Sequence, residues 1–290
     1  MIDRPQININ QQTLSKPLVI NGVGLHSGVK VRIKLIPADT DYGIKFIRTD
    51  LKHNNIVSAI WSNVTNTQLS TTISNNFGVS VSTVEHLMSA LSGLHIDNLI
   101  IEIDGPEVPI MDGSSKNFVE LIDKISLRTQ NKKRKIIKIK KKIKVEKDDS
   151  SIELTPNSQF SIDFQIDFPS PLISKQSCQL QLVNGNYKTD IASARTFGFE
   201  KDVDKLRSIG LALGGSLNNA VVVGESKILN REGLRFKDEF VRHKILDSIG
   251  DLYLAGAPIQ GYFNGNKSGH YLNNLLLKNL FSNKQNYEYI

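Results

Sequence analysis

The chain has 290 residues, which is long enough for two domains, and it carries a formal net charge of +7. Its one cysteine, Cys178, excludes an internal disulfide and a cysteine-rich zinc site, so any metal must bind to His, Asp or Glu side chains. No apolar run approaches the roughly 20 residues that span a bilayer, and residues 1–10 contain no basic segment followed by an apolar one. We therefore expect a cytoplasmic protein that is not an integral membrane protein.

The first part of the chain is predicted to contain strands and two helices. Apolar and polar residues alternate, as in strands, over residues 29–35, 43–48 and 98–103. A helix with an apolar stripe is predicted to begin near Ser82 or Thr83 and to end near Gly93, and a shorter helix is predicted over residues 118–125.

Two side chains at the start of the first predicted helix carry competing interpretations. Glu85 completes the pattern Ser82-Thr83-Val84-Glu85, which matches a capping box, so its carboxylate could simply reach back to the helix N-terminus. His86 points away from the apolar stripe, which makes it a poor candidate for a core residue.

Basic residues are concentrated in one segment. Residues 131–147 contain ten Lys or Arg and one Glu, a net +9, which leaves −2 for the rest of the chain. Lys132–Lys135 is predicted to be a linker between a domain of residues 1–130 and a domain of residues 131–290, and a single strand with one lysine face is predicted after it, from Ile137 to Val145. The exposed lysines of that face are Lys138, Lys140, Lys142 and Lys144.

The favoured interpretation of this lysine face is an edge strand that the lysines protect from pairing with other chains. Contact with anionic phosphates or with an acidic membrane surface is the alternative. Nucleic-acid binding is disfavoured, because no aromatic residues alternate with the lysines and the charge is confined to one strand.

The second half resembles the first in its pattern of elements. Residues 151–154 and 160–168 alternate as strands, and helical periodicity appears again nearer the C-terminus. We therefore predict an α+β protein of two related domains, each a β-sheet layered with helices. Residues 206–223 form an apolar stretch interrupted by Gly214 and Gly215, which predicts either a loop leading into a buried strand or a channel for a long apolar ligand.

A helix is predicted over residues 236–256. Its apolar side chains lie on one side, and His243, Asp247 and Asp251 form a stripe with one-turn spacing on the other. An imidazole and a carboxylate one turn apart can share a metal ion. A solvated polar face is the simpler alternative for such a stripe.

A catalytic zinc site commonly has three protein ligands and one open position. His86, His243 and Asp247 could supply these ligands, with Glu85 as a base and His270 as a second proton-transfer group. His270 follows Gly269 in a predicted loop, where a histidine is more often incidental, and the neighbouring Lys267 could contact an anion or could be solvated.

Several segments together resemble the zinc-dependent UDP-3-O-acyl-N-acetylglucosamine deacetylases, the enzymes of the committed step of lipid A synthesis. The matching segments occur in order along nearly the whole chain and are G-V-G-L-H-S-G (22–28), S-T-V-E-H-L (82–87), P-E-V-P-I-M-D-G-S (106–114), S-A-R-T-F-G-F (193–199), L-A-L-G-G-S-L (211–217), G-L-R-F-K-D-E-F-V-R-H-K-I-L-D-S-I-G-D-L (233–252) and K-S-G-H-Y-L-N-N (267–274).

The resemblance implies a role for each matching residue of the site. His86, His243 and Asp247 would bind one zinc ion. Glu85 would be the general base for the attacking water, and His270 would protonate the leaving amine. An active site in the cleft between the two domains would follow, because these residues come from both halves of the chain.

The same resemblance implies supporting and substrate-binding residues. Asp251 would orient His270, and Thr196 would help to stabilise the oxyanion. Residues 206–222 would form the passage for the acyl chain. The implied substrate contacts, which include two lysines for the phosphates, are Phe197, Lys244, Lys267, Leu25, Ser216 and Val222.

The implied reaction is hydrolysis of the N-acetyl group of a UDP-linked, acylated amino sugar. We expect the enzyme to be a monomer, and the lysine face together with a lipid-bearing substrate suggests transient contact with the inner membrane surface. One departure from the family pattern concerns the turn after the lysine strand, where Asp148-Asp149-Ser150 replaces a basic residue and Lys147 is the available substitute. A zinc amidohydrolase for a different acylated amine is the remaining alternative.

Overall fold

Two five-stranded sheets with the same topology form the outer layers of the protein. The computed structural model describes residues 9–183 and 185–290. The sheet of the first half has the order β2-β3-β9-β4-β5, and the sheet of the second half has the order β12-β13-β19-β14-β15. In each sheet the strand that comes last in the sequence is central, antiparallel to one neighbour and parallel to the other.

The prediction of two related α+β units is therefore confirmed, although the sequence contains no strict repeat. The strands of the two large sheets are β2 (Leu18–Val23), β3 (Lys30–Pro37), β4 (Ile44–Arg48), β5 (Ile56–Ser58), β9 (Leu99–Ile103), β12 (Ile143–Lys147), β13 (Ser150–Thr155), β14 (Ser161–Asp167), β15 (Lys175–Gln181) and β19 (Tyr262–Asn266).

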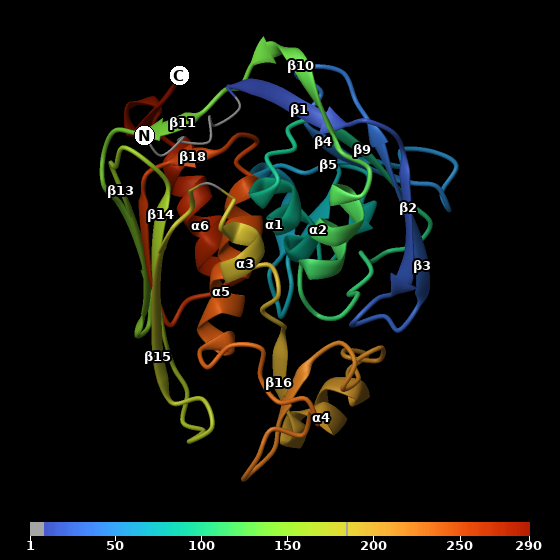
Figure 1. Ribbon diagram of the computed structural model, residues 1–290, viewed down its shortest axis with the longest axis vertical. Coiled ribbons are helices and arrows are strands. Elements are labelled where there is room, and N and C mark those ends of the chain that lie inside the picture. Colours follow the sequence, from blue (N-terminus) through green and yellow to red (C-terminus); the bar gives the residue numbers. More distant parts are fainter. Residues whose placement is uncertain (1–8, 184) are drawn as a thin grey trace.

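The main helices lie between the two sheets, so that the layers follow one another as sheet, helices, helices, sheet (Figure 1). Each sheet has one apolar face, and helices bury that face because it cannot remain in water. These helices are α1 (Glu85–Gly93), α2 (Lys116–Asp123), α5 (Glu239–Tyr253) and α6 (His270–Phe281), and the short α3 (Tyr187–Asp190) lies beside them.

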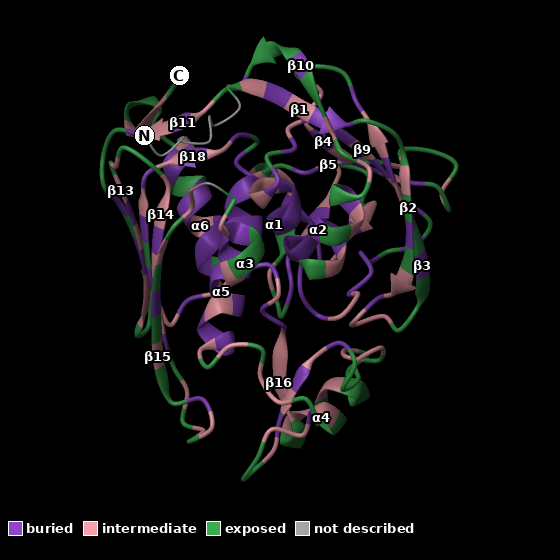
Figure 2. Cartoon of the chain, viewed as in Figure 1, coloured by how far each residue is buried: buried purple, intermediate pink, exposed green. Residues whose placement is uncertain are grey.

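Helices α1 and α5 are the most deeply buried, as their colouring in Figure 2 shows. Their backbones approach closely at Gly250, where a Cβ atom would overlap the carbonyl oxygen of Glu85 and lie 3.0 Å from the amide nitrogen of Ser89. The residue that begins α1 therefore lies directly against α5 near its C-terminal end. This contact joins the two halves of the chain.

Smaller elements complete the fold. An insertion projects from the second half, at the bottom of Figure 1, and contains a two-stranded sheet and a short helix. These elements are β16 (Phe197–Phe199), α4 (Val203–Ser208) and β17 (Val221–Val223). The remaining strands are β1 (Asn10–Leu14), β6 (Val64–Asn66), β7 (Thr72–Ser74), β8 (Ser80–Val81), β10 (Leu127–Lys133), β11 (Ile137–Ile139), β18 (Ile259–Gln260) and β20 (Tyr287–Tyr289).

The predicted lysine strand is wrong in detail. It is two strands, β11 and β12, which belong to different sheets, and the chain between them leaves strand geometry. Only β12 lies at an edge, since β11 runs between β18 and β20. The predicted linker is also partly wrong, because Lys132 and Lys133 belong to β10, which pairs with β1.

The predicted boundary between residues 130 and 131 falls within β10 and stays a prediction. The capping-box interpretation of Glu85 is wrong: α1 begins at Glu85 itself, and its N-cap residue, Val84, makes no side-chain cap. His270 is the first residue of α6 and does not lie in a loop.

No helix in the described part of the chain is both long and apolar enough to cross a bilayer. The prediction that the chain lacks a secretory signal concerns residues 1–10, and of these residues 1–8 lie outside the described part of the structure.

Candidate metal and acid–base centre

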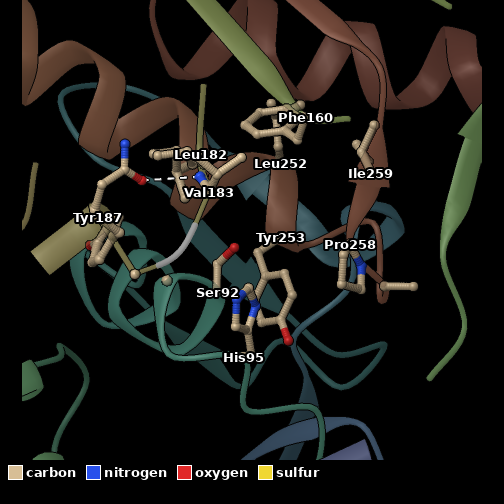
Figure 3. A pocket seen from close by; sticks show the side chains of 15 residues that line it. Ser92, His95, Phe160, Leu182, Val183, Tyr187, Leu252, Tyr253, Pro258 and Ile259 are labelled. Carbon is tan, nitrogen blue, oxygen red and sulfur yellow. Dashed lines mark hydrogen bonds between the residues drawn. The ribbon is translucent and has the colours of Figure 1, made fainter. Parts of the chain in front are cut away.

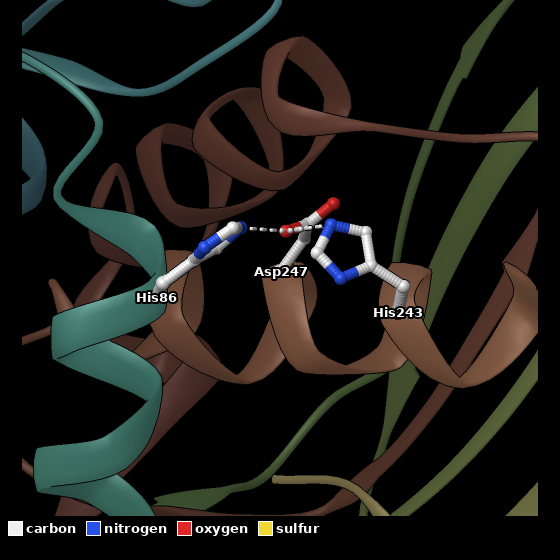
Figure 4. A group of neighbouring side chains, drawn as sticks. All are labelled: His86, His243 and Asp247. Atoms are coloured by element: carbon white, nitrogen blue, oxygen red, sulfur yellow. Dashed lines mark ion pairs between the residues drawn. The ribbon is translucent and has the colours of Figure 1, made fainter. Parts of the chain in front are cut away.

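Three buried side chains from α1 and α5 converge on one point. Figure 4 shows His86 reaching from α1 toward Asp247, while His243 reaches toward the same carboxylate from one turn earlier on α5. The Nε2 atoms of His86 and His243 lie 3.5 Å and 3.3 Å from Oδ1 of Asp247. Each of the three side chains exposes at most 5 % of its surface, so the interpretation of the α5 stripe as a solvated face is wrong.

The chemistry of these residues fits a metal ion. One nitrogen or oxygen atom from each lies within 4.8 Å of the others. Oδ1 of Asp247 is buried and has no hydrogen-bond partner, which is costly for a carboxylate unless a cation meets it. Nδ1 of His243 donates to the carbonyl oxygen of Ala194 at 3.1 Å, which leaves Nε2 with its lone pair free for a metal.

Electrostatics keep His243 and Asp247 in the protonation states that metal ligands need. Burial lowers the pKa of His243 to about 4, so its imidazole is neutral at pH 7. Burial would raise the pKa of Asp247, but His243 and Lys244 outweigh it and hold the pKa well below its usual value. The centre therefore offers a neutral imidazole at His243 and a carboxylate at Asp247, the forms in which these groups bind a metal.

Glu85 lies beside this cluster at the start of α1. Its carboxylate is buried, and burial raises its pKa, which favours a group that can take up a proton. Oε2 accepts a hydrogen bond of 3.0 Å from the backbone N–H of Thr71. Oε1 lies 4.0 Å from Nε2 of His270.

His270 and Asp251 form a buried pair on the other side of Glu85. Nδ1 of His270 donates to Oδ2 of Asp251 at 2.8 Å. Burial alone would lower the pKa of His270, but the charge and hydrogen bond of Asp251 outweigh burial and raise it to about 9. His270 is therefore protonated at pH 7 and can donate a proton.

A cavity of about 530 Å³ opens over this centre. It is lined by residues of both halves, and the predicted site residues among them are Leu25, Glu85, His86, Thr196, Phe197, His243, Lys244, Asp247, Lys267 and His270. Asp251 lies behind His270. The sequence thus identified most of the polar residues that the fold brings together.

The predicted phosphate-binding lysines already have acidic partners. Nζ of Lys244 donates to Oδ2 of Asp247 at 3.1 Å. Nζ of Lys267 lies 3.2 Å from Oδ2 of Asp149 and 3.1 Å from Oδ2 of Asp167. Lys147, which also lines the cavity, rests its ammonium group 4.6 Å from the centre of the Tyr271 ring.

The remaining predicted contacts, Ser216 and Val222, lie on the insertion and do not line this cavity. The insertion is fixed to the first half because the N–H groups of Leu213 and Gly214 donate to the carbonyl oxygens of His26 and Leu25. A Cβ at Gly215 would lie 3.7 Å from the Leu25 side chain. The glycine-rich turn therefore sits against the loop that carries Leu25.

Two residues that the sequence did not indicate support the centre. Thr71 contacts Glu85 and also donates from its hydroxyl to Oδ1 of Asp251 at 2.6 Å. Glu239, which is fully buried, accepts hydrogen bonds from the backbone N–H and the side chain of Arg195, next to the carbonyl that orients His243. Neither belongs to a spacing that is typical of catalysis.

A separate, mainly apolar pocket of about 120 Å³ lies near the C-terminal end of α1 (Figure 3). Its polar lining includes Ser92 and His95, and burial together with Arg134 lowers the pKa of His95 to about 4. It contains none of the residues of the metal and acid–base centre. Among residues 9–183 and 185–290, that centre alone combines metal ligands with a base and an acid, and its chemistry falls in the class of metal-assisted hydrolysis.

Comparison with known proteins gives the family. Residues 11–282 match the LpxC family, UDP-3-O-acyl N-acetylglycosamine deacetylase. The chain belongs to this family, so it is a deacetylase and a hydrolase, as the sequence predicted.

Curated relatives cover almost the whole chain. The UDP-3-O-acyl-N-acetylglucosamine deacetylase of Syntrophus aciditrophicus is 49% identical over 277 residues, 96% of this chain and 88% of the relative. The enzymes of the same name from Myxococcus xanthus and Mannheimia succiniciproducens are 48% and 49% identical over 97% of this chain, which corresponds to 89% and 93% of their own lengths.

The converging ligands predict selective loss of metal on substitution. We expect His243→Ala and Asp247→Ala to lower bound metal from about one ion per chain to well below half, because two ligands hold a divalent cation much more weakly than three. His53→Ala, which changes an exposed histidine, is the matched control and should keep its metal. Metal analysis after dialysis measures the effect, and full retention by both site variants would contradict the centre.

Proposed function

We propose that the chain hydrolyses the N-acetyl group of UDP-3-O-(3-hydroxyacyl)-N-acetylglucosamine to the free amine and acetate, with one zinc ion held by His86, His243 and Asp247. The observation that carries this proposal is the placement of a buried base and a protonated histidine 4.0 Å apart beside three convergent metal ligands. The relatives that match nearly the whole chain bear the name of this activity.

Zinc, when bound, would supply Lewis acidity that polarises the amide carbonyl and lowers the pKa of water to about 7. The protein's own residues then divide the proton transfers. Glu85, whose pKa burial raises, takes a proton from the attacking water. Thr196 lines the cavity, and its hydroxyl donates a hydrogen bond to the carbonyl oxygen of the substrate as negative charge develops there.

The leaving amine departs poorly unless it is protonated, and His270 supplies that proton. Asp251 keeps His270 in the imidazolium form and fixes its ring through the 2.8 Å hydrogen bond at Nδ1. Nε2 is thereby left to face Glu85 and the cavity. The base thus serves the attacking water and the acid serves the leaving nitrogen.

The substrate's remote groups would bind around this centre. We assign the diphosphate to Lys244 and Lys267, with Lys147 in place of the basic residue that the turn at Asp148 lacks. Phe197 lines the same cavity and packs edge-on against Phe240, which gives it a fixed apolar surface for the substrate. The acyl chain would follow Leu25 toward the insertion, where Ser216 and Val222 complete its passage.

Substitution of the base tests this function. We expect Glu85→Ala to retain about one zinc per chain and to lose acetate release by roughly a hundredfold or more, because general-base catalysis contributes about 10²–10⁴ to the rate. Acetate release from the UDP-linked substrate is measured beside metal content, with Glu102→Ala, on the partly exposed face of β9, as control. Wild-type chain that binds zinc without releasing acetate would overturn the substrate and favour another amide.

The pKa of His270 predicts an alkaline limit to activity. The acid form is lost as pH rises through the pKa, so kcat/KM should fall above about pH 9, or somewhat lower once a nearby cation disfavours the imidazolium. Asp251→Asn removes the charge that raises this pKa, and we expect the alkaline limb to move at least about one unit to lower pH. A pH profile of both proteins checks this, and an unmoved limb would contradict the pairing.

We also propose that the lysine face contacts an acidic membrane surface. Lys138 and Lys140 lie 3.1 Å and 3.3 Å from carboxylate oxygens of Glu288, and Lys142 lies 2.6 Å from Glu153, so part of the charge of this face is already neutralised. A monomeric state and a cytoplasmic location likewise stay predictions.

Vesicle sedimentation tests the membrane contact. We expect weak binding to anionic vesicles that declines with salt and is lost when Lys138, Lys140, Lys142 and Lys144 are replaced by Gln. Neutral vesicles serve as control. Equal binding of the wild type and the fourfold variant would remove the lysine face from the proposal.

A further inference from the structure

Thr71 is a buried residue outside every motif of the site, and each of its polar groups is used at the centre. Its N–H donates to Oε2 of Glu85 at 3.0 Å, and its carbonyl oxygen accepts from the N–H of Val84, the residue before α1, at 3.3 Å. Its hydroxyl donates to Oδ1 of Asp251 at 2.6 Å. The residue is 2 % exposed, so none of these bonds competes with bulk water.

These bonds join two pairs of residues from opposite halves of the chain. Thr71 and Glu85 belong to the first half, whereas Asp251 and His270 belong to the second. Asp251 divides its two oxygens: Oδ1 accepts from Thr71, and Oδ2 accepts from His270 and from Asn273, both at 2.8 Å. A continuous chain of hydrogen bonds therefore runs from Glu85 through Thr71 and Asp251 to His270.

We infer that Thr71 is a positioning residue that fixes the distance between the general base and the general acid. Oε1 of Glu85 and Nε2 of His270 lie 4.0 Å apart, and both must reach the reacting amide, the first through the attacking water and the second at the leaving nitrogen. Errors of about 1 Å in such a separation are costly for proton transfer. The backbone N–H of Thr71 holds Glu85, and its hydroxyl holds Asp251, the partner of His270. A single residue therefore sets the distance between the base and the acid.

The inference rests on the proposed roles of Glu85 and His270. It assigns separate functions to two parts of Thr71, since any residue can supply the N–H whereas only Ser or Thr can supply the hydroxyl at this reach. Loss of the hydroxyl alone would leave Glu85 in place and free one oxygen of Asp251. The His270–Asp251 pair could then shift relative to the base without loss of the metal ligands.

The test compares Thr71→Val, Thr71→Ser and Thr72→Val in the zinc-loaded enzyme. We expect Thr71→Val to lower kcat about tenfold with KM and zinc content unchanged, because a buried acceptor loses its donor. Thr71→Ser should return kcat to within about twofold of the wild type. Thr72→Val makes the same change at the neighbouring residue of β7 and should leave kcat unchanged.

A double-mutant cycle separates this role from a merely structural one. If Thr71 acts through Asp251, adding Thr71→Val to Asp251→Asn should lower kcat by less than about twofold further. Independent effects that multiply would overturn the inference, as would unchanged kcat in Thr71→Val or a parallel loss of zinc and melting temperature. Absence of acetate release from the wild type would instead overturn the proposed function, so the two failures are distinguishable.

Discussion

The close contact between α1 and α5 at Gly250 is the constraint on which the site depends. Because glycine lets the backbone of α5 lie against Glu85, side chains one turn apart on α5 can reach His86 on α1. A larger residue would separate the helices by more than the tolerance of a metal site, whose ligand distances vary by only about 0.2 Å. The same helix–helix contact therefore packs the core and brings the metal ligands together.

Each sheet contributes to this contact from the outside. The central strands β9 and β19 come last in their sheets, so α1 lies on the chain before the first and α5 lies before the second. The duplicated topology therefore places equivalent helices against each other across the interface. The two equivalent helices differ in what they supply: α1 carries a base and one metal ligand, while α5 carries two metal ligands and the partner of the acid.

The sequence predicted the layout well where one element carries the signal. The strands at residues 29–35, 43–48 and 98–103 and the helix at 236–256 are present with ends shifted by a few residues, because periodicity reports which face is buried more reliably than where an element ends. The prediction of one lysine strand was wrong because the alternation resumes in the same register after Lys140–Lys142, where the chain leaves one sheet and enters another. Such a change depends on partners that are distant in the sequence.

Site residues were also hard to predict where their roles depend on partners that are distant in the sequence. His243 and Asp247 lie on one helix, so their spacing allowed either a shared ion or a solvated face, and only the fold shows that the stripe is buried. Thr71 could not be identified, since its role arises from a contact with Asp251, 180 residues away. Glu85 illustrates the reverse case, because its local sequence pattern matched a helix cap. The buried N–H of Thr71 and the approach of α5 outweigh that local preference, and the carboxylate turns toward the cavity.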